Sequence, residues 1–237
     1  EREKAGLCDP TDDHALKPIS EHLDAFRSYM ISKGGTMRNV DDTLNRIEKI
    51  VDDAGWKRIT EVLAGDVTQY LAKLKKDGFS IQTQNHYLRA AKHFTRWLVK
   101  DRRMTFDPLS HLSIQNAEVD RKVQRRAVSD DEFARLLDAA ETGPILNMVS
   151  GPDRALLYIL AAWTGFRKGE LGSLTRKSFK LDGKLPVVTV QAGYSKHRRQ
   201  DTQVLHPTVV QTLNQWLAHR KLEPNELLFP ICDRIPA

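Results

Sequence analysis

Two stretches of the chain decide its fold by their order. Residues 152–174 read PDRALLYILAAWTGFRKGELGSL, and residues 186–207 read PVVTVQAGYSKHRRQDTQVLHP. In the first stretch an apolar helix reaches Thr164-Gly165, and a second helix opens at Arg167. In the second stretch two alternating strands flank a basic tip that carries Lys196. An arginine at a buried helix start and a lysine on a later hairpin can converge on one phosphate.

The composition favours a polyanionic partner. The chain has 237 residues, 40% of them hydrophobic, a formal net charge of +6 and a pI of about 9.3. Nucleic acid is the simplest such partner, and a merely basic globular protein is the plain alternative. Cys8 and Cys232 lie at opposite ends without metal-ligand spacing, so we expect a reducing compartment, no disulfide and no metal. No apolar run approaches the roughly 20 residues of a membrane span, and we expect a cytoplasmic, nucleoid-associated protein.

The first half of the chain is predicted to be a helical domain over residues 18–109. Apolar stripes at helical spacing begin at Ile19, Val40, Val67 and Tyr87, and glycines close the first three. Four amphipathic helices with short connections indicate a compact four-helix bundle. Residues 1–17 are polar and acidic, and we expect them to be a disordered lead.

Charge is uneven within this half. Between Lys73 and Arg103 there are nine basic residues and only two acidic ones. Most such runs are solvated faces, and the functional alternative is a face that follows DNA phosphates. The DNA contacts predicted here are Arg38, Gln82, Thr83, Arg89, Lys92 and Arg96, with Asn85 and His86 as further polar neighbours.

Residues 110–126 are predicted to be a basic linker. Asp107-Pro108 breaks the fourth helix, and the polar segment that follows ends in RKVQRR. The bases at its end are either a plain solvated tether or contacts along a DNA backbone. These four residues are Arg121, Lys122, Arg125 and Arg126.

The second domain is predicted over residues 127–237. Ser129 and Glu132 have the spacing of a capping box at a helix start. The helix at 153–163 is apolar nearly all round, so we expect it to be buried. A valine-rich strand at 185–191 and a return strand at 202–205 predict a hairpin, and Pro207 opens a last helix. The whole chain is therefore mainly α with a small antiparallel β-hairpin or sheet.

The motif TGFRKGEL at residues 164–171 resembles the first arginine motif of tyrosine recombinases, the phage-integrase family. The hairpin YSKHRRQDT, followed by LHP, is similar to the catalytic lysine hairpin of the same family. The bundle before the linker resembles its SAM-like core-binding domain. The resemblance covers roughly residues 18–237 and implies a core-binding domain followed by a partial α+β catalytic domain.

The resemblance implies a site-specific recombinase or integrase. In this family a tyrosine attacks a DNA phosphate, forms a 3′-phosphotyrosyl link and releases a 5′-hydroxyl, without metal or cofactor. Arg167 would hold phosphate oxygens, Lys196 would protonate the leaving oxygen, and Glu170 would orient the guanidinium. The plain alternative for Arg167 and Glu170 is an i,i+3 ion pair that only stabilises the helix start. The plain alternative for Lys196 is a solvated turn residue. Three neighbouring bases are predicted to contact the DNA backbone, or else to be plain surface residues: Lys168, Arg198 and Arg199.

Several family residues are missing from the sequence after the hairpin. The family also has a His-x-x-Arg pair and a nucleophilic tyrosine there, but no such pair follows Lys196 and no tyrosine follows Tyr194. The strings His86–Arg89 and His93–Arg96 have the His-x-x-Arg spacing, but they precede the arginine motif. We therefore interpret them as DNA contacts and not as the catalytic pair. We therefore expect this chain to lack a nucleophile, to bind duplex DNA without cleaving it, and to be a monomer in solution. The complete protein would form tetramers on paired DNA sites.

Three alternatives remain open at this point. The chain could be a non-catalytic DNA-binding regulator or remnant of the same fold. It could be a helical protein whose basic face binds an acidic protein. A type IB topoisomerase shares the chemistry but relaxes DNA without site specificity.

Overall fold

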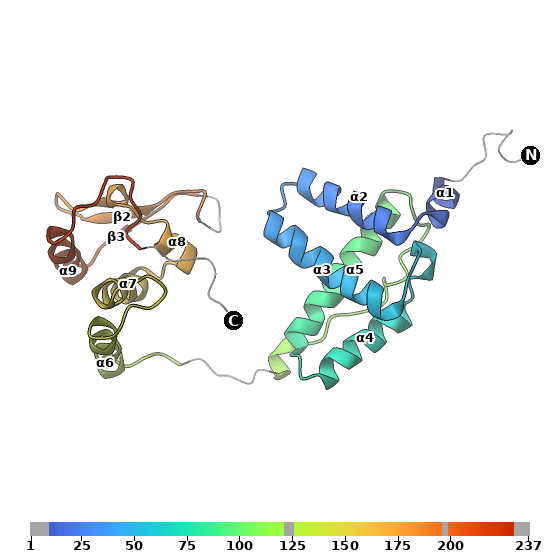
Figure 1. The fold of residues 1–237 in the computed structure, drawn as a ribbon, viewed down its shortest axis with the longest axis horizontal. Coiled ribbons are helices and arrows are strands. Elements are labelled where there is room, and N and C mark those ends of the chain that lie inside the picture. Colours follow the sequence, from blue (N-terminus) through green and yellow to red (C-terminus); the bar gives the residue numbers. More distant parts are fainter. Residues whose placement is uncertain (1–9, 121–125, 196–198, 230–237) are drawn as a thin grey trace, which may run out of the picture. The chain divides into compact units, whose positions relative to one another are not determined.

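The computed structural model describes residues 10–120, 126–195 and 199–229, and it divides the chain into two compact units (Figure 1). Unit 1 is Glu1–Gln124 and unit 2 is Arg125–Ala237. The fold is mainly helical with a small antiparallel sheet, as the sequence predicted. No helix within the described ranges is both long and apolar enough to cross a membrane.

Unit 1 contains the four predicted helices. The predicted glycine stop of α3 is confirmed at Gly55, where φ is 71°. This helix begins after Thr36, whose Oγ1 accepts a hydrogen bond from Asn39 N. The start of α5 is capped in the same way by Ser80. The helices are α1 (Pro10–Leu16), α2 (Ile19–Ser32), α3 (Met37–Ala54), α4 (Ala64–Lys76) and α5 (Ile81–Lys100).

The core of unit 1 forms around α5, which packs against α3 and α4. Phe26 of α2 lies fully buried between two aromatic side chains of α5, with ring centroids 5.4 Å from Phe94 and 5.2 Å from Trp97. Leu44 and Ile50 of α3 complete this apolar centre. Burial of these large side chains is the main stabilising contribution to the bundle.

The predicted disorder of residues 1–17 is wrong for residues 10–16, which form α1. The ring of His22, fully buried on α2, hydrogen-bonds through Nε2 to the carbonyl of His14 at 3.1 Å. The two imidazole rings also meet edge to face, with centroids 5.6 Å apart. These contacts attach α1 to the bundle and explain its order. Residues 1–9 lie outside the described part of the chain.

The segment after α5 returns along this helix. Asn85 donates to the carbonyl of Gln115 at 2.7 Å and accepts from the amide of the same residue at 2.9 Å. Further along, Asp120 accepts from Ile81 N at 2.9 Å, and Leu109 is fully buried. Residues 110–120, which the sequence assigned to a linker, therefore pack on unit 1.

Unit 2 combines four helices with a three-stranded antiparallel sheet in the order β1-β2-β3. The predicted hairpin is confirmed, with Val187 opposite Val204. The short edge strand β1 was not predicted. The elements are α6 (Asp130–Glu141), α7 (Gly151–Thr164), α8 (Lys168–Gly172), β1 (Phe179–Lys180), β2 (Val187–Val190), β3 (Asp201–Val204) and α9 (Pro207–Ala218).

The core of unit 2 lies between the sheet and the helices α7 and α9. Val188 of β2, Leu160 of α7 and Leu213 of α9 are all fully buried in one cluster. The predicted all-round burial of α7 is wrong at its C-terminal end, where Trp163 is 52% exposed. The buried residues of α7 all lie between Gly151 and Leu160, so only the first part of the helix is covered.

The connection between α6 and α7 is tightly held. The buried guanidinium of Arg154 donates to the carbonyls of Ala140, Pro144 and Val149. At the tip of the connection, Asn147 and Met148 both have positive φ, 50° and 64°. This pair of left-handed residues turns the chain so that α7 can start directly beside the end of α6.

Candidate functional site

The turn that carries Arg167 is built by its neighbours in the sequence. Thr164 Oγ1 donates to the carbonyl of Leu160 at 2.6 Å and accepts from Phe166 N at 3.2 Å. Gly165 has φ of 66°, a conformation that glycine adopts without strain. The buried ring of Phe166 then anchors the turn. Thr-Gly-Phe therefore ends α7 and directs the chain into α8 with Arg167 at its N-terminus.

Arg167 forms two hydrogen bonds with Glu170. The carboxylate of Glu170 accepts from Arg167 N at 2.7 Å and from its Nη1 at 3.2 Å. Glu170 is buried, whereas the side chain of Arg167 is 59% exposed. The predicted orientation of the guanidinium by Glu170 therefore has a geometric basis, and the arginine remains accessible to an anion from solvent.

The hairpin tip is described only at its edges. Lys196 and Arg198 lie outside the described residues, so the predicted catalytic lysine has no described geometry. At the edge of the tip, an open hollow of about 470 Å³ is lined by Ser195, Arg199, Gln200 and Asp201. Arg199 is exposed there, as a backbone contact requires.

At the other end of the hairpin, an aromatic stack connects the arginine turn to α9. Trp163, at the end of α7, stacks on His206, with ring centroids 4.3 Å apart and an interplanar angle of 19°. His206 in turn accepts from Thr208 N through Nδ1 and so caps α9. No sequence motif marks this stack, because its two members come from elements far apart in the chain.

The predicted DNA contacts of unit 1 are found in different environments. Gln82, Arg89 and Arg96 are exposed on one side of α5, and Arg38 is exposed in the first turn of α3. Thr83 is half-buried, and its backbone amide and hydroxyl both contact the side chain of Ser80. The exposed members are available to phosphate, whereas the threonine belongs to the helix cap.

The structure contradicts the prediction that Lys92 contacts DNA. This residue is only 8% exposed, and its ammonium donates to the carbonyls of Ser110, at 3.0 Å, and Leu112. Both carbonyls belong to the segment that returns along α5. The ammonium is therefore bound inside unit 1 and is not a surface contact for phosphate.

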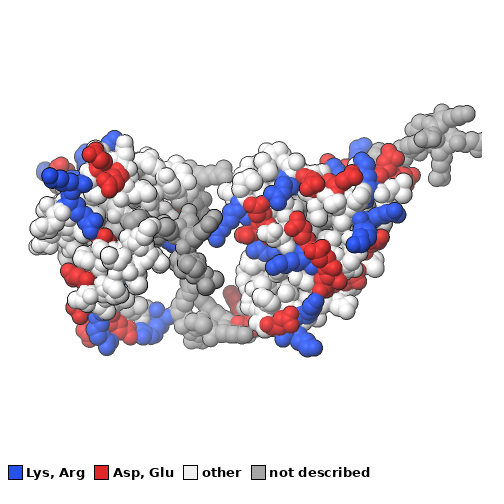
Figure 2. Space-filling view, viewed as in Figure 1, with Lys and Arg blue, Asp and Glu red and all other residues white. Residues whose placement is uncertain are grey.

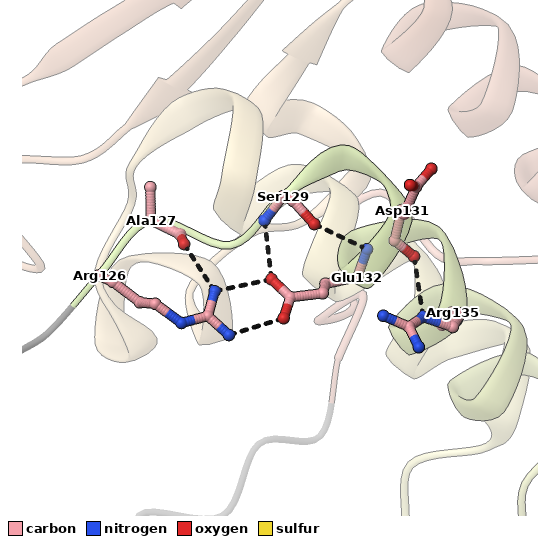
Figure 3. Close-up of polar contacts among 6 residues, drawn as sticks. All are labelled: Arg126, Ala127, Ser129, Asp131, Glu132 and Arg135. Carbon is pink, nitrogen blue, oxygen red and sulfur yellow. Dashed lines mark hydrogen bonds and ion pairs between the residues drawn. The ribbon is translucent and has the colours of Figure 1, made fainter.

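Of the four bases predicted at the end of the linker, only Arg126 lies within the described residues. It forms a bidentate ion pair with Glu132 (Figure 3). Its Nη1 and Nη2 donate to the two carboxylate oxygens at 2.7 and 2.6 Å. The Arg126 guanidinium and the backbone amide of Ser129 lower the pKa of Glu132 to about 2. Ser129 completes the predicted capping box of α6. Arg121, Lys122 and Arg125 lie outside the described residues.

Other basic side chains are paired with acids at the surface. Figure 2 shows basic and acidic side chains interleaved over the part of unit 1 that it presents. Arg27 contacts Asp41 at 2.7 Å, and Lys73 forms an ion pair with Asp53. Among the described residues, no three His, Cys, Asp or Glu side chains gather as a possible metal site.

Comparison with known proteins finds relatives of this chain. The family model described as "Phage integrase, N-terminal SAM-like domain" matches residues 23–102, which cover the bundle from α2 to α5. Tyrosine recombinase XerD of Rhizobium meliloti (strain 1021) is 27% identical over 181 residues, which make up 70% of this chain and 55% of XerD. The chain is therefore similar to proteins of the tyrosine recombinase, or phage integrase, family.

Solved structures show a similar fold. A lambda integrase dimer bound to a COC′ core site has a TM-score of 0.69 at 17% identity, over 91% of this chain and 57% of the integrase. A lambda integrase tetramer bound to a Holliday junction has a TM-score of 0.68 at 17% identity, over 86% and 57%. The chain therefore spans little more than half the length of these relatives.

Proposed function

We propose that this chain binds duplex DNA and contributes the arginine and lysine part of a recombinase site that breaks and rejoins DNA. The observation that supports this best is the exposed Arg167 guanidinium, which buried Glu170 holds at the start of α8. We propose that the region matching the SAM-like domain, residues 23–102, is a second DNA-binding unit.

The proposed chemistry follows from the properties of the two cations. The planar guanidinium of Arg167 would bind the non-bridging oxygens of the phosphate and stabilise the charge that grows there during attack. Loss of one such preorganised donor typically raises a barrier by about 3 kcal/mol. Lys196 would donate a proton to the 5′-oxygen as its bond to phosphorus breaks. Glu170 would position the arginine and would not touch the substrate.

The proposed partners follow from the relatives. Lambda integrase has been solved as a dimer on a core site and as a tetramer on a Holliday junction. We propose duplex DNA as the partner of this chain and a tetramer on paired sites for the complete recombinase. The sequence contains no tyrosine after Tyr194, so we propose that this chain by itself binds DNA and does not cleave it.

Binding is tested by fluorescence anisotropy with a labelled duplex of random sequence at several salt concentrations. Each phosphate that the protein neutralises is expected to contribute a slope of about −0.9 to the plot of log K against log salt. Neutralising Arg89 and Arg96 by glutamine should reduce the slope by about 1.8 in total. Lys49→Gln is the control, because Lys49 lies beside Asp52 and Asp53 in an acidic hollow. Weak binding without salt dependence would contradict the proposal.

Cleavage is tested separately on a denaturing gel. The chain alone should leave no covalent protein–DNA band after incubation with duplex DNA. A band that survives denaturation would contradict the absence of a nucleophile. Equal competition for the labelled DNA by an acidic protein and by unlabelled duplex would favour a protein partner instead.

A further inference from the structure

Helix α5 exposes a single stripe of side chains. Of all its residues from Ile81 to Lys100, only the six in this stripe are exposed, and every other one is buried or half-buried. The stripe repeats at intervals of four and three residues and extends for about 27 Å along the helix. We call it the α5 stripe, and its members are Gln82, His86, Arg89, His93, Arg96 and Lys100.

The α5 stripe alternates histidines with cations and contains no acid. His86 lies one turn from Arg89, and its Nε2 is 3.3 Å from the amide nitrogen of Gln82. His93 lies one turn from Arg89 on one side and Arg96 on the other. Its ring meets Phe26 of α2 edge to face, with centroids 5.0 Å apart. Each imidazole is therefore held in place while it remains exposed at the surface.

The surroundings of both histidines disfavour a positive charge in the free protein. Partial burial lowers the pKa of His86, and Arg46 of α3 and Arg89 of α5 lower it further. Partial burial also lowers the pKa of His93, followed by Arg96 and Lys100 of α5. The side chain that α2 packs against His93 is the uncharged Phe26. The neutral form of both imidazoles is therefore favoured when no anion lies on the stripe.

A DNA backbone on the stripe would reverse this balance. Phosphates next to the arginines bring negative charge to within reach of both imidazoles and compensate the repulsion by the cations. A protonated imidazole donates from both ring nitrogens, so it can form a charge-assisted hydrogen bond to a phosphate oxygen. The proton comes from the solvent, and no other reactant is needed.

We propose that His86 and His93 are phosphate contacts of the α5 stripe and that DNA binding shifts both towards the protonated form, with an uptake of about one proton in total near neutral pH. This inference rests on the proposed DNA-binding function and adds two contacts and a pH dependence to it. Acidic conditions would then tighten DNA binding through this helix, and alkaline conditions would leave only the permanent cations of the stripe. The sequence had suggested that these residues touch DNA but gave no reason for a proton to accompany the contact.

The magnitude follows from proton linkage. Uptake of one proton in total makes the association constant change about tenfold for each pH unit. If the two histidines together take up about one proton near neutral pH, affinity should increase about tenfold from pH 7 to pH 6. Calorimetric titrations in buffers with different ionisation enthalpies measure the same proton number directly.

The experiment measures DNA anisotropy from pH 6 to pH 8 at one ionic strength. The variants are the double substitution His86→Gln with His93→Gln, and the control His111→Gln, which changes an exposed histidine of unit 1 outside the stripe. The wild type and the control should bind about tenfold more tightly at pH 6 than at pH 7, and their affinity should level off towards pH 8. The double variant should keep the wild-type affinity at pH 8, which also shows that it is folded, and should lose most of the pH dependence.

The outcomes separate this inference from the proposed function. Tight, salt-dependent binding that does not change with pH in the wild type would overturn the inference and leave DNA binding intact. An unchanged pH dependence in the double variant would also overturn it, because the protons would then bind elsewhere. Absence of salt-dependent binding at every pH would contradict the proposed function itself.

Discussion

Replacement of Lys92 by methionine tests whether this lysine supports the fold or contacts DNA. The ammonium donates to the carbonyls of Ser110 and Leu112 from a buried position on α5. Methionine keeps the aliphatic stem in place but removes both donors. If Lys92 instead contacted phosphate, the substitution would leave the stability unchanged and weaken DNA binding.

The expected loss of stability follows from the two hydrogen bonds. A hydrogen bond from a charged donor contributes about 1.5–3 kcal/mol. The exposed Ser110 can bind water instead, and removal of the ammonium also relieves the cost of its burial. We therefore expect a net loss of about 2 kcal/mol in the free energy of unfolding of unit 1. With about 2.1 cal/mol/K of unfolding entropy per residue and roughly 110 folded residues, the melting temperature should decrease by about 9 °C.

Differential scanning calorimetry and DNA anisotropy on the same samples decide between the two roles. Arg96→Met is the matched control, because Arg96 lies one turn further along α5 and is exposed. The control should change the free energy of unfolding by less than about 0.5 kcal/mol and reduce the salt slope of DNA binding by about 0.9. The reasoning is refuted if Lys92→Met melts like the wild type and loses a phosphate from the salt slope.

Three further predictions concern buried and paired side chains. Burial lowers the pKa of His22 below 6.5, so the folded state binds fewer protons than the unfolded state. The free energy of unfolding of unit 1 should therefore be highest above pH 6.5 and decrease as the pH falls below it. Melting from pH 8 to pH 5 measures this decrease, and His22→Asn should reduce it. Glu170→Gln should lower the stability of unit 2 by about 1–2 kcal/mol, because it weakens the acceptor of Arg167 N and of its guanidinium; an unchanged urea midpoint would contradict this role. Glu132→Gln should release Arg126 and steepen the salt slope of DNA binding by up to about 0.9, whereas an unchanged slope would mean that Arg126 does not reach phosphate.

The helices α2 to α5 of unit 1 could be predicted because each carries its own signals. Apolar residues repeat at helical spacing, and Gly55 marks the end of α3 by a backbone conformation that glycine favours. The contact between Arg167 and Glu170 could be predicted for the same reason, since the two residues are one turn apart. Local interactions of this kind are visible in a single sequence.

The role of the segment after α5 could not be predicted from local signals. The partners of Lys92 and Asn85 lie far along the chain, at residues 110–115, and the segment that contains them has no hydrophobic period. It therefore resembled a linker, and the lysine resembled a surface base. Only the packed structure shows that buried polar groups of α5 are paired with the backbone of this segment.

The α1 helix and strand β1 were missed for different reasons. The order of α1 depends on His22, which is outside the predicted lead and reaches back to the carbonyl of His14. Strand β1 has two residues, too few for an alternating pattern, and exists because β2 pairs with it. The exposed end of α7 was missed because an apolar sequence does not reveal which of its sides has a neighbour.

The left-handed turn between α6 and α7 offers a position for a fluorescent reporter. Met148 is 67% exposed and already has positive φ, so a cysteine there would adopt the same backbone at no added cost. It lies at the opposite end of α7 from Arg167, and the helix between them is about 21 Å long. With the two native cysteines, Cys8 and Cys232, changed to serine, a single dye on Met148→Cys would be attached to unit 2 alone. Energy transfer from this dye to an end-labelled duplex would then report the arrival of DNA at the arginine turn without altering any residue of that turn.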